Sequence, residues 1–418
     1  MKLKSPRILH FASSLQGGAN IAGKRLHNAM VRQGLDSTFY YGEGHSENRT
    51  YFPLYQQTSF LIRNQAAIKT AFWARRCNSN GFVVGNKWIR KTPVPESASQ
   101  NTVVCLHWIS RWLDLPSFFS SLPADVPIVW TLHDLIPITG GCANTYDCEN
   151  FTTNCGFCPQ LKKPKRMDMA RLFQDEKMPL YRNHNLHFVA NSSWTARKAE
   201  TSALGRLAHS ITRIHYGLNL EEYRAIDKET ARRSLSLPVK EKVIIGFSCL
   251  DFNDERKGAR KLIKALGQLP GELQNKIILL VLGGGSWPKA ECNFEMVSLG
   301  AMSDARLQSI FYSSLNFFVL ASSSETFGNV VIEAMACKTP VVAYDCGGPS
   351  DTVKDGITGL LVSYPDNDEQ LSNKIRWMID HPSESQRMGD AARQDVEIRF
   401  TDSMMAERYL KLFDDIGI

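Results

Sequence analysis

Short, continuously apolar segments alternate with helical segments along this chain, and the whole series occurs twice. In the first series the apolar segments are residues 7–13, 37–42, 102–109, 127–134 and 186–192. They lack a polar face, as do the strands of a parallel sheet that is buried on both sides. Strand, glycine-rich turn, helix and strand follow one another over the first 42 residues, an order that is typical of a doubly wound α/β domain.

The second series starts near residue 242 and has the same organisation. Its apolar segments are residues 242–249, 276–285, 316–323, 340–348 and 358–364. A chain of 418 residues is too long for one compact core, so we expect two domains. We predict domains at 1–218 and 219–395, and a helix at 396–418 that packs back on the first domain. Ligands of such sheets bind beyond the carboxyl ends of the strands, which places a ligand between the two halves.

Composition indicates an ordinary globular protein. The chain is 43% hydrophobic and 22% charged. The N-terminal residues lack an apolar stretch of signal-peptide length, and no stretch reaches the roughly 18 apolar residues of a membrane span. We therefore expect a cytoplasmic protein with reduced thiols.

Charge is distributed unevenly between the two halves. Residues 1–218 hold 26 Lys and Arg against 13 Asp and Glu, whereas residues 219–418 hold 23 against 29. A basic first half indicates an anionic partner. No nucleic-acid-binding motif is present, so we expect no nucleic acid. The favoured interpretation is contact with a membrane surface through residues 62–76, and the alternative is a solvated basic face. The run "KKPKR" at 162–166 is expected to be solvated, or to attract a lipid diphosphate.

Two glutamates, Glu325 and Glu333, interrupt an apolar region. Glu325 lies before a helix that is expected to begin near Asn329, and the free N–H groups at such a helix end favour an anion or sugar hydroxyls. Glu333 lies about one turn inside this helix among apolar residues. A buried carboxylate costs several kcal/mol unless it is paired or hydrogen-bonded. Ribose hydroxyls would satisfy Glu333, and so would a lysine or solvent.

The stretch 325–362 resembles the retaining glycosyltransferases of family 4, in which two glutamates with this spacing mark the nucleotide-sugar site. Residues 15–20 are similar to the glycine-rich loop of that family, and residues 255–258 to its Lys-Gly segment. The sequence "TLHDLIPITGGC" at 131–142 is similar to bacterial exopolysaccharide and O-antigen enzymes, including the colanic acid group. This resemblance implies the GT-B fold, in which two Rossmann-like domains face each other across a cleft.

The resemblance also implies roles for individual residues. Glu325 would contact the transferred sugar and stabilise positive charge at its anomeric carbon, Lys257 would neutralise the leaving phosphate, and His133 would lie near sugar and acceptor. The residues that would bind the donor are Gly17, Gly18, Arg256, Lys257, Phe327, Gly328, Asn329 and Glu333. Fixed N–H groups and a lysine can stabilise the leaving diphosphate, so no catalytic metal is expected.

Three positions depart from the family pattern. Leu250 or Asp251 stands where the family usually has an arginine, which leaves the diphosphate to Lys257 with Arg256. The segment 216–219 and Ser350 also differ from the usual residues. These departures weaken any inference about the identity of the donor but leave the fold prediction intact.

Four cysteines follow the His133 segment closely. They are Cys142, Cys148, Cys155 and Cys158. Four thiols with a closing C-x2-C in a reduced compartment favour a structural zinc site. Two disulfides or four free thiols are the alternatives. The loop 142–158 is expected to shape the acceptor side of the site.

Two further residues near His133 leave alternatives open. His107 ends a strand and is either a core histidine or a substrate contact. Asp134 either orients His133 or caps the turn that follows it.

Together these observations predict a retaining glycosyltransferase that moves a sugar from a nucleotide-diphosphate donor to a lipid-linked bacterial glycan. It would act at the cytoplasmic face of the membrane. The alternatives are a nucleotide-sugar epimerase, a phosphorylase, or a sugar-binding scaffold without catalysis. The donor, acceptor, linkage and oligomeric state do not follow from the sequence.

Overall fold

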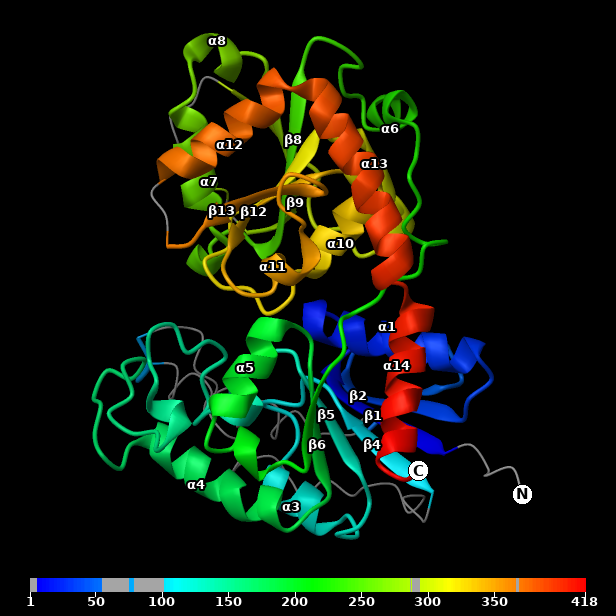
Figure 1. Cartoon of the computed structure of the whole chain (residues 1–418), viewed down its shortest axis with the longest axis vertical. Coiled ribbons are helices and arrows are strands. Elements are labelled where there is room, and N and C mark those ends of the chain that lie inside the picture. Colours follow the sequence, from blue (N-terminus) through cyan, green and yellow to red (C-terminus); the bar gives the residue numbers. More distant parts are fainter. Residues whose placement is uncertain (1–5, 55–74, 79–100, 286, 288–293, 366–367) are drawn as a thin grey trace. The chain divides into compact units, whose positions relative to one another are not determined.

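The structure is a computed structural model that describes residues 6–54, 75–78, 101–285, 287, 294–365 and 368–418. The chain divides into two compact units, Met1–His215 with Met405–Ile418, and Tyr216–Met404 (Figure 1). Each unit is built on one parallel sheet, as the two series of apolar segments predict. The boundary predicted at residue 396 lies inside a helix that continues to Arg399.

The first unit has a seven-stranded sheet in the order β3-β2-β1-β4-β5-β6-β7. Its strands are β1 (Arg7–Ser14), β2 (Ser37–Glu43), β3 (Tyr51–Pro53), β4 (Thr102–Leu106), β5 (Ile128–Leu132), β6 (Leu186–Ala190) and β7 (Ser210–Arg213). All neighbouring strands are parallel. The central strands β4, β5 and β6 are buried throughout, which explains their continuous apolar sequences.

Helices cover both faces of this sheet. They are α1 (Gly18–Arg32), α3 (Leu115–Ser120), α4 (Met169–Arg182), α5 (Ser193–Thr201) and the greater part of α14 (Asp402–Asp415), with short 3-10 helices η1 (Ile136–Ile138), η2 (Asn150–Thr152) and η3 (Gly205–Leu207). Alternate strand residues such as Leu9 and Phe11 pack with Phe118 of α3 and Tyr181 of α4 in one core. The C-terminal helix belongs to this unit because the Tyr409 hydroxyl hydrogen-bonds to Thr131 of β5 at 2.7 Å.

The second unit has a six-stranded sheet in the order β10-β9-β8-β11-β12-β13. Its strands are β8 (Val243–Asp251), β9 (Ile277–Gly284), β10 (Glu295–Ser298), β11 (Phe317–Leu320), β12 (Val341–Asp345) and β13 (Gly359–Ser363). Its helices are α6 (Lys228–Ser234), η4 (Glu255–Lys257), α7 (Ala259–Gly267), α8 (Gly271–Gln274), α9 (Ala305–Ser314), α10 (Asn329–Ala336), α11 (Pro349–Thr352), α12 (Asp368–Asp380) and α13 (Pro382–Arg399).

The helices of the second unit also lie on two faces. Alternate strand residues such as Ile245 and Phe247 pack with Leu262 of α7 and Ile375 of α12 on one face. Helix α10 packs against β11 and β12, and against α9 and α13, so it is enclosed on several sides (Figure 1). This enclosure explains why six of its eight residues are buried.

The described residues bear on two predictions about membranes, contact through residues 62–76 and the absence of a membrane span. Of the segment 62–76, only Arg75 and Arg76 are described, so the predicted membrane contact lies almost entirely outside the described residues. Within the part of the chain that the structure describes, no helix is both long and apolar enough to cross a membrane.

Candidate functional site

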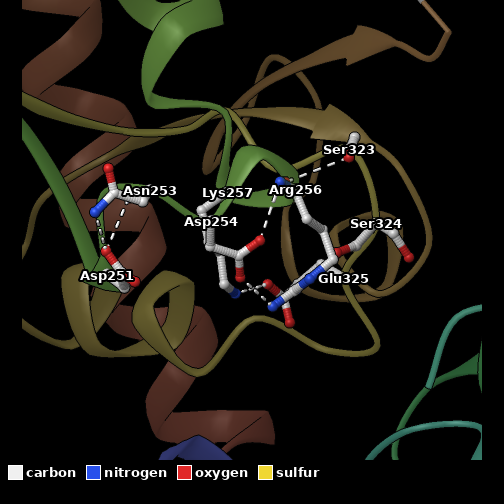
Figure 2. A network of polar contacts seen from close by, with 8 residues as sticks. All are labelled: Asp251, Asn253, Asp254, Arg256, Lys257, Ser323, Ser324 and Glu325. Atoms are coloured by element: carbon white, nitrogen blue, oxygen red, sulfur yellow. Dashed lines mark hydrogen bonds and ion pairs between the residues drawn. The ribbon is translucent and has the colours of Figure 1, made fainter. Parts of the chain in front are cut away.

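Lys257 and Glu325 form an ion pair at the carboxyl ends of two adjacent strands. Lys257 ends η4, which follows β8, and Glu325 lies in the loop between β11 and α10. Figure 2 shows the two side chains pointing toward each other, and the Lys257 Nζ lies 2.7 Å from the Glu325 Oε2. The side chains retain exposed fractions of 25% and 14%, so a small ligand can still reach both. The sequence predicted both residues but gave no direct evidence that they touch.

Arg256 ties together the two loops that carry this pair. Its guanidinium donates to the Asp254 carboxylate at 2.9 Å and to the Ser324 carbonyl at 3.3 Å (Figure 2). The Arg256 carbonyl in turn accepts from the Ser323 N–H at 2.8 Å. The resemblance gave Arg256 a role at the diphosphate, and the structure adds a positioning role.

Glu325 is held in its ionised form. Burial raises the pKa of this carboxyl, but the charges of Lys257 and Arg256, with hydrogen bonds from Lys257 and the Thr326 backbone, outweigh burial, and the net result is a lowered pKa. The site therefore presents a fixed negative charge beside a lysine at neutral pH.

Two glycines set the geometry of these loops. A Cβ at Gly258, next to Lys257, would overlap the Ala321 carbonyl, and the φ of Gly258 is +77°. A Cβ at Gly348 would overlap the backbone of Phe327, while the Gly348 N–H donates to the Glu325 carbonyl at 2.8 Å. Gly348 therefore packs closely against the Glu325 loop.

The N-terminus of α10 opens directly beside Glu325. The helix starts at Asn329 after Gly328, whose φ is +89°, and no described side chain caps it. Phe327 anchors this turn, because its buried ring contacts Tyr216 and Phe400 with centroid distances of 4.9 and 5.9 Å. Backbone N–H groups at the start of a helix attract anions, as the sequence predicted for this turn.

Glu333 lies inside α10 and is only 6% exposed. It accepts a hydrogen bond from the Tyr312 hydroxyl at 3.0 Å. Burial and the neighbouring Glu333 carboxylate raise the pKa of Tyr312, so the phenol remains a donor. The sequence allowed a lysine or solvent as the partner of Glu333 and missed Tyr312, since nothing in the sequence of α9 distinguishes this tyrosine from a core residue.

The predicted residues of the first unit lie at the carboxyl ends of its strands. Gly17 precedes α1 and has a φ of +86°, and a Cβ there would meet no described atom within 4 Å. Backbone conformation is thus sufficient to require glycine at this position. Gly18 begins α1, and His133 follows β5 directly.

The structure shows contacts of Asp134 and His107, the two residues near His133 for which alternatives were open. Asp134 accepts from the Trp108 indole N–H at 2.8 Å and from the Ile136 N–H at 2.9 Å, so it caps the following turn. His107 is 2% exposed and belongs to the core, but its Nδ1 lies 3.1 Å from Nε2 of His133.

The four cysteines gather around one small apolar cluster. Cys142, Cys155 and Cys158 are buried with Phe151 and Phe173, and all four cysteines are free thiols. The predicted alternative of two disulfides is therefore absent. Among the described residues, no group of three or more His, Cys, Asp or Glu side chains is arranged to hold a metal ion. Structural zinc stays a prediction, which elemental analysis of protein purified without chelator would test.

Comparisons with known proteins agree with the geometry of the second unit. Residues 227–395 match the family described as Glycosyl transferases group 1. The chain is 29% identical over 215 residues to D-inositol 3-phosphate glycosyltransferase 1 of Catenulispora acidiphila, a match that covers 47% of this chain and 49% of the relative. The matched region of this chain thus spans about half the length of that relative.

Two solved structures resemble nearly the whole chain. Sucrose-phosphate synthase from Thermosynechococcus elongatus has a TM-score of 0.67 at 21% identity and covers 98% of this chain and 99% of its own. Anabaena Alr3699/HepE in complex with UDP-glucose has a TM-score of 0.65 at 16% identity, with 98% and 100% coverage. At these identities the likeness concerns the fold, and it confirms the predicted GT-B class with two parallel-sheet α/β domains.

Proposed function

We propose that this chain is a retaining glycosyltransferase. It moves a sugar from a nucleotide-diphosphate donor to a hydroxyl of a growing, lipid-linked glycan of the bacterial surface. The observation that carries the proposal is the Lys257–Glu325 ion pair beside the N-terminus of α10, with Glu333 buried in the same helix. All of these residues lie within the region that matches the glycosyltransferase family.

The charges of this site suit cleavage of a sugar–diphosphate bond. Departure of the nucleotide leaves concentrated negative charge, which Lys257 and the N–H groups of α10 can stabilise without moving. The ionised Glu325 can stabilise the positive charge that develops at the anomeric carbon. Glu333, oriented by Tyr312, is positioned for ribose hydroxyls. Retention without a separate nucleophile follows if the acceptor attacks from the face that the phosphate leaves, and the phosphate takes its proton.

A panel of UDP-, GDP- and ADP-sugars in a thermal-shift assay tests donor binding, because a ligand that binds only the native state raises its melting temperature. We expect sugars of one of the three nucleotides to raise the melting temperature clearly. Glu325→Gln, which keeps the shape and removes the charge, should retain this shift and lose at least about a hundredfold in transfer rate. The proposal is wrong if no donor raises the melting temperature, or if Glu325→Gln transfers sugar at the full rate.

Product analysis separates the remaining alternatives. NMR of the product should show the anomeric configuration of the donor, and inversion would contradict the retaining mechanism. Conversion of the donor without any acceptor would indicate an epimerase. Because the matched relative is named for D-inositol 3-phosphate, phosphorylated polyols belong in the acceptor panel beside lipid-linked glycans.

The lipid-linked acceptor is supported by a surface of the first unit that we call the basic surface. It consists of the exposed residues Arg75, Arg76, Lys162, Lys163, Lys165 and Arg166. The two parts are far apart in the sequence but adjacent in space, since the Lys162 N–H donates to the Arg76 carbonyl at 2.8 Å. Phe157, 63% exposed, is hydrogen-bonded through its N–H to the Lys165 carbonyl at 2.7 Å. Clustered cations with an exposed aromatic ring suit an anionic lipid surface.

A further inference from the structure

A long loop, residues 133–168, connects β5 to α4 in the first unit, and we call it the β5–α4 loop. It begins with His133 and Asp134, and it contains all four cysteines of the predicted zinc site. Its regular structure consists of the short 3-10 helices η1 and η2. Loops of more than about 12–15 residues are uncommon in compact domains and usually carry function. Their buried main-chain groups need hydrogen-bond partners from elsewhere.

Helix α4 supplies such partners to the first turn of the loop. The Lys177 Nζ donates to the Ile136 carbonyl at 2.5 Å and to the Thr139 carbonyl at 2.9 Å. Tyr181 lies one turn further on the same face of α4, and its hydroxyl donates to the Pro137 carbonyl at 2.8 Å. Both side chains are buried, and Lys177 is only 6% exposed. These bonds fix the position of η1 against α4.

The same helix holds the part of the loop that carries the cysteines. Gln174, three residues before Lys177, accepts from the Cys155 N–H at 2.6 Å. Asp168, the N-cap of α4, accepts from the Cys158 N–H at 2.8 Å. In the loop, each of these bonds ends on a main-chain atom. Helix α4 therefore sets the path of the loop backbone and leaves the loop side chains for other contacts.

Two further features show that this path is tightly specified. A Cβ at Gly140 would overlap the Ala170 carbonyl of α4. Tyr146 and Phe157 have φ values of +47° and +46°, a region that bulky side chains rarely adopt. Such conformations persist only where the surrounding structure over-determines them, and they are concentrated at functional sites.

Lys177 differs from the other α4 side chains in this set because it buries a cation. Burial lowers the pKa of Lys177 to about 8, and the carboxylates of Asp134 and Glu176 are among the groups that oppose this shift. The lysine is therefore mostly protonated at neutral pH, and its charge acts on the residue that follows His133. A buried charge is costly even when it is hydrogen-bonded, and an apolar residue would avoid that cost. Stability alone thus does not explain a lysine at this position.

We propose that Lys177 is a positioning residue for the acceptor side of the site. Its buried ammonium holds η1, and η1 in turn sets the place of His133 at the carboxyl end of β5. Lys177 acts through the loop and does not itself touch the substrate, because it is enclosed between α4 and η1. The role at the acceptor rests on the proposed function, whereas the fixing of the loop does not.

Hydrogen exchange followed by mass spectrometry tests the fixing of the loop without any activity measurement. Lys177→Met keeps most of the side-chain volume and removes the donors, so the amides of residues 135–158 should exchange at least about tenfold faster. Arg232→Met in the second unit is the matched control. Arg232 is 4% exposed and also donates to main-chain carbonyls, those of Ser314 and Val239. Unchanged exchange in Lys177→Met, or an equal increase in the control, would overturn the proposal.

Kinetics with an active pair of donor and acceptor tests the role at the acceptor. In Lys177→Met, kcat/KM for the acceptor should fall about 10- to 100-fold, because misplaced groups lose most of their effect. The thermal shift caused by the donor should stay that of the wild type, since Lys257, Glu325 and Glu333 lie in the second unit. Arg232→Met should melt earlier and keep its kcat/KM. The same loss of kcat/KM in Arg232→Met would reduce Lys177 to a merely structural residue and refute the proposal.

Tyr181→Phe covers the case in which Lys177→Met does not fold. It removes only the bond to the Pro137 carbonyl, so exchange at residues 135–142 should rise, and kcat/KM for the acceptor should fall, each by about 2- to 10-fold. Wild-type values of both would then overturn the proposal. If exchange changes as expected but no pair of donor and acceptor supports transfer, the proposed function fails and the fixing of the loop stands. If transfer occurs and Lys177→Met leaves it unaffected, only the present inference fails.

Discussion

At the scale of single residues, the second unit buries a carboxylate among apolar residues, where an apolar side chain would be more stable. Glu333 is buried in α10 and accepts a hydrogen bond from the Tyr312 hydroxyl. A hydrogen bond to a charged group contributes about 1.5–3 kcal/mol. Glu333 thus makes the fold less stable than a hydrophobic residue at this position would. Such a loss of stability is expected of a residue that is retained for binding.

Tyr312→Phe is expected to weaken donor binding. Removal of the hydroxyl takes away the hydrogen bond by which α9 orients Glu333, so the thermal shift caused by the sugar donor should shrink, and the free energy of unfolding should fall by about 1–3 kcal/mol. Tyr181→Phe is the control, because it removes a buried hydroxyl bonded to the Pro137 carbonyl in the other unit. That variant should lose stability and keep the shift. Equal shifts in both variants would contradict a role of Tyr312 at the donor site.

The buried histidines predict a stability that depends on pH. Burial lowers the pKa of His107 to about 3 and that of His27 to about 4. Below pH 6.5 the unfolded chain takes up protons that the folded chain does not, so stability falls as pH falls. The loss is up to about 1.4 kcal/mol per pH unit for each group. Urea unfolding at pH 7.5 and 5.5 measures this loss, and equal stability at the two values would contradict it.

At the scale of elements, the loops that carry Lys257 and Glu325 are positioned by backbone contacts at glycines. Gly258 lies against the Ala321 carbonyl, and Gly348 against the Phe327 backbone. These contacts connect η4, the Glu325 loop and the turn after β12 into one assembly. The spacing of the two charges therefore depends on positions that carry no side chain.

Gly348→Ala is expected to impair catalysis more than folding. The added methyl group would displace the loop that holds Glu325, so transfer should fall about 10- to 100-fold, with a destabilisation of about 1–3 kcal/mol. Gly267→Ala, at the end of α7 where a Cβ meets no described atom within 4 Å, is the matched control and should be neutral or stabilising. Transfer assays and urea unfolding of both variants test this expectation. Full activity of Gly348→Ala would show that the contact does not position Glu325.

At the scale of the whole molecule, positive charge is concentrated in the first half of the sequence, and part of it forms the basic surface. Exposed cations near an anionic bilayer contribute about 1 kcal/mol each. A protein without a membrane-spanning helix in its described residues can thus still associate with a lipid surface.

Vesicle sedimentation tests this association. The wild-type protein should bind vesicles that contain anionic lipid and should lose binding to neutral vesicles or at high salt. Replacement of Lys163, Lys165 and Arg166 by alanine should reduce binding at least tenfold. A matched replacement of the exposed Arg233, Lys240 and Arg387 in the second unit should not. Equal binding by both triple variants would contradict the basic surface as the contact.

The sequence by itself determined the two parallel sheets, because a strand buried on both faces must be apolar throughout, whatever its neighbours are. It also determined Glu325 and Glu333 as candidates, since their residue types and spacing are local properties, and the resemblance to a known family added Lys257. The sequence did not determine the contact of Glu333 with Tyr312, the hydrogen bonds from His10 through His107 to His133, or the meeting of Arg76 with Lys162. These pairs are separated by 21 to 97 residues, and only the tertiary structure decides which distant groups meet. A hydrogen bond depends on position and direction in space, which local sequence patterns do not specify.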